Sequence, residues 1–361
     1  MKEYSENRLA LMALSAVQGL TFRQKHALLS LTDEPKELFP SLEAFSDRIA
    51  ELSEGLFDRL AEVRKGFQKD RVLNYMEKTG SFALFEDDEE YPDAFKALDD
   101  PPLVLYGKGD VSLLKKDCFA IIGTREPTRY GRDVAELFAK DLAAAGFTIV
   151  SGLARGVDSV SHRAALDAFG KTIGVIGCGI DRVYPAENKQ LYEEMSEKGL
   201  VLSEYFFGEK PVSFHFPERN RLISALSKGV LVVEAGLKSG TLLTVEHAFD
   251  QGKDVFAVPG NIFSDKSKGS NELLHNPLVL PACSPQDVLD FYKINAPKKE
   301  ERAVQLSTSE IVVYDLLKDD DKHFEELIAE TGLSMGELLE ALTKLEVLGV
   351  IKKLPGNYYG I

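Results

Sequence analysis

Seven short apolar runs recur through the middle of the chain, and stretches long enough for a helix separate most of them. They are rich in β-branched residues and comprise Val104–Tyr106, Phe119–Ile122, Thr148–Val150, Thr172–Ile176, Leu200–Leu202, Val230–Val233 and Val255–Val258. Strands that are apolar throughout are buried on both faces, and parallel strands need crossover segments between them. The pattern therefore predicts an α/β fold, a parallel sheet with helices on both faces.

Helical patterns flank this sheet on both sides. From about Asn7 to Lys78 apolar residues recur at helical spacing, which predicts several short helices. After a charged stretch at Lys298–Arg302, expected to be a linker, three helices and a hairpin predict a winged-helix arrangement. We therefore expect three domains: residues 1–80, helical and SAM-like or helix-hairpin-helix-like; residues 81–295, the sheet domain; and residues 296–361, the winged helix. The last three helices are expected at about Ser309–Leu317, Phe324–Glu330 and Ser334–Leu348.

Neither flanking domain carries a strong DNA-binding pattern. Val17–Thr21 loosely resembles a helix-hairpin-helix turn, but a role in packing or protein contacts is the favoured interpretation. The third helix of the winged-helix domain carries Glu337, Glu340 and Glu346 against Lys344 alone. Such a surface repels phosphate, so protein contact or domain packing is favoured there too. Lys352 and Lys353 leave the wing able to contact a DNA backbone.

Charge and cysteine content narrow the class of protein. The formal net charge is −15, which argues against coating DNA by bulk electrostatics. Residues 115–265 are nearly neutral, with 18 basic and 20 acidic side chains, so a polyanion site has to be a local groove of placed arginines and backbone amides. Three scattered cysteines predict neither a disulfide framework nor a metal site. The acidic N-terminus and the lack of a long apolar run predict a cytoplasmic protein without a membrane segment.

Glycine, serine, threonine and arginine residues occupy the turns between the predicted strands and the helices that follow them. The clearest cases are Gly123-Thr124-Arg125, Ser151–Gly156 and Ser239-Gly240-Thr241. Helix N-termini offer unpaired N–H groups and partial positive charge, and arginine adds a bidentate fork for phosphate. Several such turns along one sheet edge predict a ligand with several phosphates, and the simplest is a nucleic-acid strand.

The stretch Phe214–Arg221 combines aromatic rings with an Arg-Asn-Arg trio at the start of a helix. Stacking rings beside phosphate-binding side chains are what single-strand binders require. The alternative places Phe216 in the core and Arg219 on a carboxylate; the neighbouring turns favour binding. Asp158 and His162 are one helical turn apart, and without a nucleophile in range we expect them to be structural.

The central stretch resembles the DNA-processing protein A family, also called DprA or Smf. The resemblance rests on motifs that follow in order over roughly 120 residues. They are Gly123-Thr124-Arg125, Ser151–Asp158, His162, Gly177-Cys178-Gly179, Tyr184–Asn188, Phe216–Arg221, Glu234-Ala235 and Ser239-Gly240-Thr241. The resemblance implies an extended Rossmann-like domain that binds single-stranded DNA, forms a homodimer and helps to load the RecA recombinase on incoming DNA in natural transformation. It also implies single-strand-binding protein as a further partner.

The motifs and the resemblance together give one candidate nucleic-acid-binding set and no catalytic residue, metal or cofactor. This interpretation requires Arg125, Arg219 and Arg221 to line one continuous cleft. The full set is Gly123, Thr124, Arg125, Arg155, Gly156, Lys189, Phe216, Arg219, Asn220, Arg221, Ser239, Gly240 and Thr241.

The alternative function is an enzyme similar to nucleotide phosphoribohydrolases, which would use Glu246 and an arginine on a nucleoside monophosphate. The Gly-Thr helix start with a downstream glutamate resembles the phosphate turn of that class. Those enzymes usually carry a denser glycine run than Leu237–Gly240. The chain also lacks the G-x-x-x-x-G-K-[ST] pattern, which argues against an ATP-driven motor. We therefore expect a single-strand binder that is not an enzyme.

Overall fold

The computed structural model describes residues 4–294, 306–318 and 320–360. It divides into two compact units, Met1–Pro297 and Lys298–Ile361. The linker predicted at Lys298–Arg302 lies outside the described residues. Within the described ranges, no helix combines the length and the apolar character that crossing a bilayer requires.

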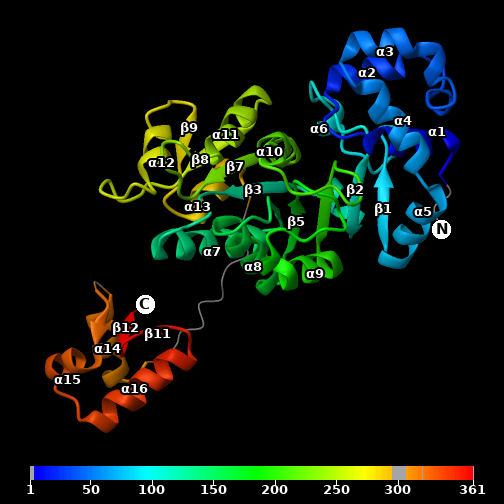
Figure 1. Ribbon diagram of the computed structural model, residues 1–361. Helices are drawn as coiled ribbons and strands as arrows, with labels where there is room; N and C mark the ends of the chain where they lie inside the picture. The colour runs from blue at the N-terminus through cyan, green and yellow to red at the C-terminus, as the bar shows by residue number, and fades with distance from the viewer. Residues whose placement is uncertain (1–3, 295–305, 319, 361) are drawn as a thin grey trace. The chain divides into compact units, whose positions relative to one another are not determined.

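A nine-stranded sheet forms the centre of the first unit, in the order β1-β2-β6-β5-β4-β3-β7-β8-β9 (Figure 1). The strands from β6 to β9 are parallel, whereas β1 and β2 pair antiparallel at one edge. Each predicted run forms a strand, and β1 and β9 are additions that the sequence did not predict. The strands are β1 (Ser81–Leu84), β2 (Leu105–Gly109), β3 (Cys118–Ile122), β4 (Thr148–Ser151), β5 (Lys171–Val175), β6 (Leu200–Ser203), β7 (Gly229–Val232), β8 (Asp254–Ala257) and β9 (Val279–Pro281).

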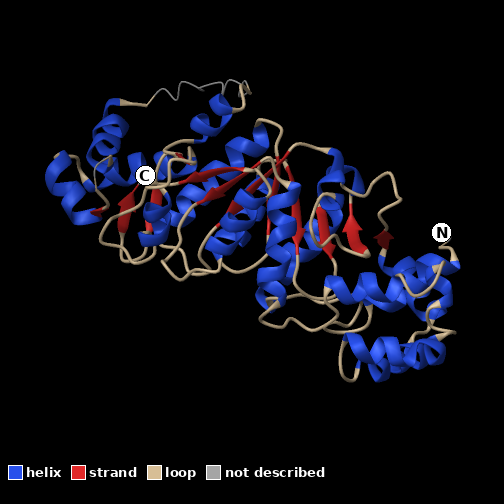
Figure 2. Ribbon diagram, turned by 90° about the horizontal axis from the view of Figure 1, so that it is seen from above, coloured by secondary structure: helices blue, strands red, loops and turns tan. Residues whose placement is uncertain are grey.

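Helices cover both faces of this sheet, as predicted (Figures 1 and 2). On one face Phe138 of α7 packs with Phe119 and Ile121, and on the other Leu222 of α10 packs with Ile122. Burial on both faces explains why the runs are apolar throughout. The helices are α6 (Asp93–Lys96), α7 (Arg129–Ala144), α8 (Val157–Asp167), α9 (Lys189–Lys198), α10 (His215–Leu226), α11 (Thr241–Asp250), α12 (Lys268–Leu273) and α13 (Pro285–Phe291), with 3-10 turns η3 (Val111–Lys115) and η4 (Ala186–Asn188).

Five short helices precede the sheet and pack beside its β1–β2 edge (Figure 1). They have a core of their own that includes Leu14 and Leu60. Leu9, Met12 and Tyr106 belong to a second cluster, which joins these helices to the sheet. The boundary expected between residues 80 and 81 stays a prediction. The elements are α1 (Glu6–Ser15), α2 (Phe22–Leu29), η1 (Pro35–Glu37), η2 (Leu42–Phe45), α3 (Ser46–Leu52), α4 (Leu56–Gly66) and α5 (Lys69–Thr79).

The second unit is a small winged helix. Its three helices enclose Val313, Leu327 and Leu342, and its three strands pair in the order β10-β12-β11. Ser307 and Ser334 begin two of the helices with reciprocal capping bonds, which satisfy exposed backbone N–H groups. The elements are α14 (Thr308–Leu317), β10 (Lys322–His323), α15 (Phe324–Thr331), α16 (Met335–Val347), β11 (Lys352–Leu354) and β12 (Tyr358–Gly360).

Candidate nucleic-acid interface

The candidate interface lies at the carboxyl edge of the parallel strands, where the strand order reverses. After β3 the chain adds β4, β5 and β6 on one side, and it then returns to add β7, β8 and β9 on the other. The turns that follow β3 and β7 therefore lead away from each other and leave a crevice. Ligands of open α/β sheets bind at such a switch point.

Three turns at this edge are hydrogen-bonded to one another through their backbones. Thr124 N donates to the Glu234 carbonyl at 2.8 Å, and Val157 N donates to the Thr124 carbonyl at 3.2 Å. Gly156 has a φ of 78°, and a Cβ there would stand 2.4 Å from the Thr124 oxygen. Glycine is required at this position both by the backbone conformation and by the close approach of the two turns. Gly156 therefore positions the turn that carries Arg125.

An open cleft of about 420 Å³ occupies the crevice. Its walls come from the β3–α7 turn, the β7–α11 turn and the first turns of α10, with Ala154 and Asp158 from the segment after β4. Four segments of the sequence thus meet at one site. The predicted residues that line the cleft are Gly123, Thr124, Arg125, Phe216, Arg219, Asn220, Ser239, Gly240 and Thr241.

Arg125 is the exposed cation of this cleft. Its guanidinium carbon lies 5.3 Å from the centroid of the Phe216 ring, and the centroid of the Tyr184 ring lies 5.4 Å from that of Phe216. A smaller pocket, which Arg155 also lines, adjoins the cleft, because Arg125 and Phe216 line both. A guanidinium over a ring keeps its N–H groups available for phosphate. Arg125, Phe216 and Tyr184 therefore combine a guanidinium that can bind phosphate with rings on which bases can stack.

The N-terminus of α11 supplies the opposite wall. Ser239 Oγ accepts a hydrogen bond from Thr241 N at 3.2 Å and donates to Thr241 Oγ1 at 2.9 Å. The N-cap residue, Gly240, has no side chain that could bond to the first amides. A helix start that lines a cleft, with no side-chain bond from its N-cap residue, favours an anion there through its partial positive charge.

Arg219 belongs to the cleft lining, but its guanidinium is not free to bind phosphate as the sequence predicted. Its side chain is buried, and Nη1 donates to the carbonyl oxygens of Gly152, at 2.7 Å, and Val175. Burial lowers the pKa of this guanidinium, and Asp158 opposes that effect. Arg219 therefore ties the turn after β4 to the end of β5.

Asp158 and His162 hold the same turn, in agreement with the structural role predicted for them. Asp158 accepts hydrogen bonds from Gly152 N at 3.1 Å and Ala154 N at 3.3 Å, and burial raises its pKa. His162 Nε2 accepts from Leu153 N at 3.3 Å, so its Nδ1 carries the proton and donates to Thr172 Oγ1 at 2.6 Å. Burial lowers the pKa of His162 to about 3, and the ring is neutral.

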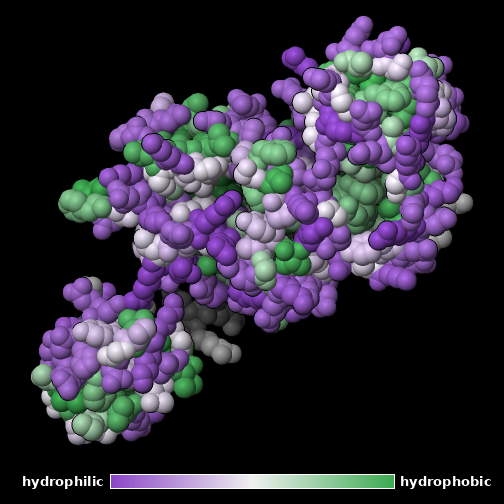
Figure 3. All heavy atoms as spheres, in the orientation of Figure 1, coloured by the Kyte–Doolittle hydropathy of each residue, from purple (hydrophilic) through white to green (hydrophobic). Residues whose placement is uncertain are grey.

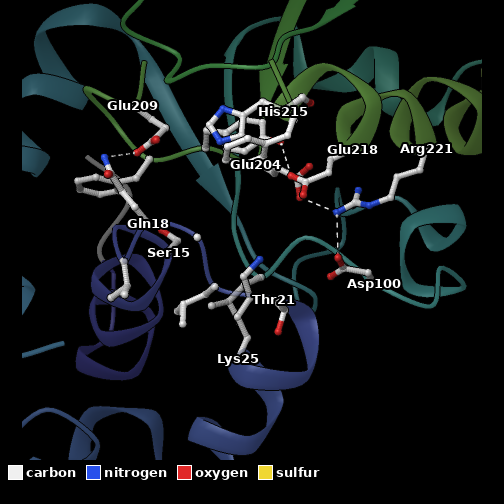
Figure 4. Close-up of a pocket in the computed structure, with 17 residues that line it drawn as sticks. Ser15, Gln18, Thr21, Lys25, Asp100, Glu204, Glu209, His215, Glu218 and Arg221 are labelled. Carbon is white, nitrogen blue, oxygen red and sulfur yellow. Dashed lines mark hydrogen bonds and ion pairs between the residues drawn. The ribbon is translucent and has the colours of Figure 1, made fainter. Parts of the chain in front are cut away.

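Arg221 lies outside the cleft, contrary to the prediction that it would line it. It lines a separate pocket of about 490 Å³ between the α1–α2 turn and α10. Figure 4 shows its guanidinium directed at two carboxylates, Glu204 at 2.6 Å and Asp100 at 3.8 Å. Glu209 and Glu218 line the same pocket. A phosphate would be repelled there, and Arg221 is already paired.

The α1–α2 turn forms the other wall of this pocket (Figure 4). Gln18 Nε2 donates to Glu209 at 2.9 Å, and Arg59 donates to the Gln18 carbonyl at 2.7 Å. The turn that loosely resembles a helix-hairpin-helix thus packs toward an acidic surface. This placement favours the packing interpretation over phosphate binding.

Three other candidate residues lie away from the cleft lining. Arg155 pairs with Glu187 at 2.8 Å and lines the smaller pocket but not the cleft. Lys189, with its side chain 71% exposed, begins α9 and lies 3.9 Å from Glu193. Glu246, the acid required by the enzymatic alternative, is exposed on α11 and is not among the residues that line the cleft.

In the winged-helix unit, α16 presents the acidic surface that the sequence predicted. Its Lys344 is paired with Glu340 at 2.7 Å and lies 3.8 Å from Glu310. Lys352 and Lys353 are exposed on β11. The favoured interpretation of this helix remains protein contact.

Two residues that matter to the site were not in the candidate set. Tyr184 extends the aromatic row beyond Phe216. Glu234 is buried and accepts hydrogen bonds from Thr128 N at 2.8 Å and Thr128 Oγ1 at 2.6 Å, which fixes the start of α7. An acidic residue directly after the apolar run Val230–Val233 was the available signal for Glu234.

Comparison with protein families gives two matches. Residues 82–293 match the model described as DNA recombination-mediator protein A, and residues 297–357 match the DprA winged helix domain. Among relatives, the DNA processing protein DprA of Bacillus subtilis is 44% identical over 56% of this chain and 69% of its own length. Protein Smf of Escherichia coli is 34% identical over 79% of each chain.

Two solved structures share the fold. The DprA of Streptococcus pneumoniae has a TM-score of 0.64 and 32% identity, covering 82% of this chain and all of the other. The DNA processing protein A of Helicobacter pylori, whose structure describes a single-stranded DNA binding mode, has a TM-score of 0.55 and 36% identity. It covers 60% of this chain and 97% of its own.

Proposed function

The chain belongs to the DNA recombination-mediator protein A family, and from this premise we propose that it binds single-stranded DNA in the cleft between the β3 and β7 turns. One observation supports this most directly: Arg125 stacks over Phe216 in the cleft that the start of α11 also lines. Phosphate fork, stacking ring and helix amides are the components of a sequence-tolerant single-strand site. The binding set proposed is Gly123, Thr124, Arg125, Phe216, Asn220, Ser239, Gly240 and Thr241.

Further parts of the proposal rest on the family alone. The protein forms a homodimer in the cytoplasm and helps to load a RecA recombinase on incoming DNA during natural transformation, where it meets single-strand-binding protein. Purified protein added to RecA and a strand coated with single-strand-binding protein is expected to speed filament assembly. An unchanged assembly rate would contradict the loading role and leave strand binding untouched.

We propose no enzymatic activity for this site. The phosphoribohydrolase alternative needs an acid beside the bound nucleotide, and Glu246 is exposed on α11. The carboxylate that does line the cleft, Asp158, is buried and accepts bonds from the turn it holds. Release of free base from adenosine monophosphate would contradict this proposal.

A titration tests the proposed strand binding. Fluorescence anisotropy compares an oligothymidylate with a duplex of equal length over a salt series. We expect tight binding of the single strand, weak binding of the duplex, and a shallow salt slope, because few cations line the cleft and each phosphate contact adds about 0.7 to the slope. Equal affinity for duplex and single strand would contradict the proposal.

A further inference from the structure

The loop between β8 and α12 carries two large apolar side chains in open solvent. Ile262 is 74% exposed and Phe263 is 88% exposed, and Leu237 on the neighbouring β7–α11 turn is 59% exposed. The loop extends from the yellow end of the first unit in Figure 1, and Figure 3 shows hydrophobic surface at its tip. Single exposed apolar side chains are common, but a group beside a binding site indicates a contact surface.

The order of the strands places this loop next to the cleft. Because the strands are parallel, their following turns share one edge in the order β5, β4, β3, β7, β8. The smaller pocket is lined by the β5 and β4 turns together with Arg125, and the cleft by the β3 and β7 turns together with Ala154 and Asp158. The β8–α12 loop is the next position in this row.

Polar contacts fix the loop to the two turns that form the cleft. Lys266 Nζ pairs with Glu126 at 3.0 Å, directly after Arg125. At the end of the loop, Gly269 N donates to the Ala235 carbonyl at 2.7 Å, and at its start Tyr130 donates to the Pro259 carbonyl at 2.8 Å. The loop is therefore held against the turns that form the cleft.

We infer that a bound strand leaves the cleft over the β8–α12 loop and that Phe263 is a stacking platform for the bases beyond it. This inference rests on the proposed function and extends the site past its predicted residues. Bases have a π-face that stacks on an aromatic ring whatever their identity. Lys238 is exposed on the neighbouring β7–α11 turn, and Lys266 lies on the same loop as Phe263, where it pairs with Glu126. The two turns therefore supply positive charge for the phosphates of a strand that crosses them.

The test uses oligothymidylates of increasing length with the full-length protein. Phe263→Ala is compared with Phe169→Ala, a matched control, since Phe169 is 98% exposed but lies in the α8–β5 loop at the opposite edge of the sheet. We expect Phe263→Ala to bind the shortest oligonucleotides as wild type does and the long ones about tenfold more weakly. Phe169→Ala is expected to match wild type at every length.

Two outcomes would overturn the inference. One is a Phe263→Ala protein that gains affinity with length as steeply as wild type. The other is a change in the sedimentation of the DNA-free Phe263→Ala protein with unchanged DNA affinity, which would make the loop a contact between copies of the chain. If wild type binds no oligothymidylate of any length, the proposed function fails, and that result is distinct from a failure at Phe263 alone.

Discussion

At the scale of single residues, Arg125 should carry the largest share of strand affinity. Among the described residues that line the cleft, Arg125 is the only exposed arginine. Arg125→Ala removes this cation together with its stacking on Phe216. We expect about tenfold weaker binding of an oligothymidylate and a salt slope lower by about 0.7. Anisotropy measures both quantities. Arg163→Ala on α8, whose partner is Glu194, is the control and should bind as wild type.

His162 should make stability depend on pH. Its pKa is about 3 in the folded protein because of burial, whereas an unfolded histidine titrates near about 6.5. Between these values the unfolded state binds more protons, so the free energy of unfolding falls as pH is lowered. The loss should approach about 1.4 kcal/mol per pH unit. Urea denaturation at several pH values measures this slope, which should become shallower in His162→Gln. Equal slopes for both proteins would refute the assignment.

The sequence predicted the cleft residues better than it predicted their orientations. Arg219, Asn220 and Arg221 are adjacent in the sequence and were assigned to one site. In an α-helix, however, successive residues are rotated by about 100° around the axis. Arg219 and Arg221 therefore lie on nearly opposite sides of α10, one beneath the cleft and one against Glu204. The requirement that three arginines line one cleft is met by Arg125 and Arg219 only. Helical periodicity applied within the motif would have separated them.

At the scale of elements, the interlocked turns are expected to tolerate no side chain at position 156. Gly156→Ala adds a methyl group 2.4 Å from the Thr124 oxygen and places alanine at positive φ. We expect a loss of more than about 1 kcal/mol in unfolding free energy and weaker strand binding, because the Arg125 turn must move. Urea denaturation and anisotropy check the two effects.

Gly146 provides the control for this prediction. It also has a positive φ, 101°, but a Cβ there would meet nothing within 4 Å. Gly146→Ala should therefore lower stability through its backbone conformation alone and leave DNA affinity unchanged. Equal effects of the two substitutions on affinity would contradict the role assigned to Gly156.

Strands with continuous β-branched runs were predictable, and weak edge strands were not. β1, Ser81–Leu84, has no β-branched residue and pairs with only one neighbour. β9, Val279–Pro281, has three residues and ends in proline, which is tolerated at a sheet edge. Pairing with an existing sheet, rather than local sequence preference, makes such segments strands.

At the scale of the whole molecule, strand binding should belong to the first unit. Removal of residues 298–361 takes away a compact unit whose α16 is acidic. We expect the remaining residues 1–297 to fold and to bind an oligothymidylate with unchanged affinity. Anisotropy and thermal unfolding measure this. A clear loss of affinity would show that the wing lysines contact the strand.

The sequence marks the division of the first unit at residue 80 less clearly than the boundary between the two units. A change from helical to strand periodicity marks the boundary, but periodicity does not report which apolar side chains share a core. Leu9 and Met12 belong to the cluster that contains Tyr106 of β2. Three domains therefore remain a prediction.

The pairing of Arg221 with Glu204 and the burial of Arg219 leave the cleft with little net positive charge. A strand held by one exposed arginine together with amides and ring faces releases few counterions when it binds. The affinity for the strand therefore changes little when a cell loses water and its dissolved salts become concentrated. Under that condition, proteins with densely basic surfaces dissociate from their nucleic acid.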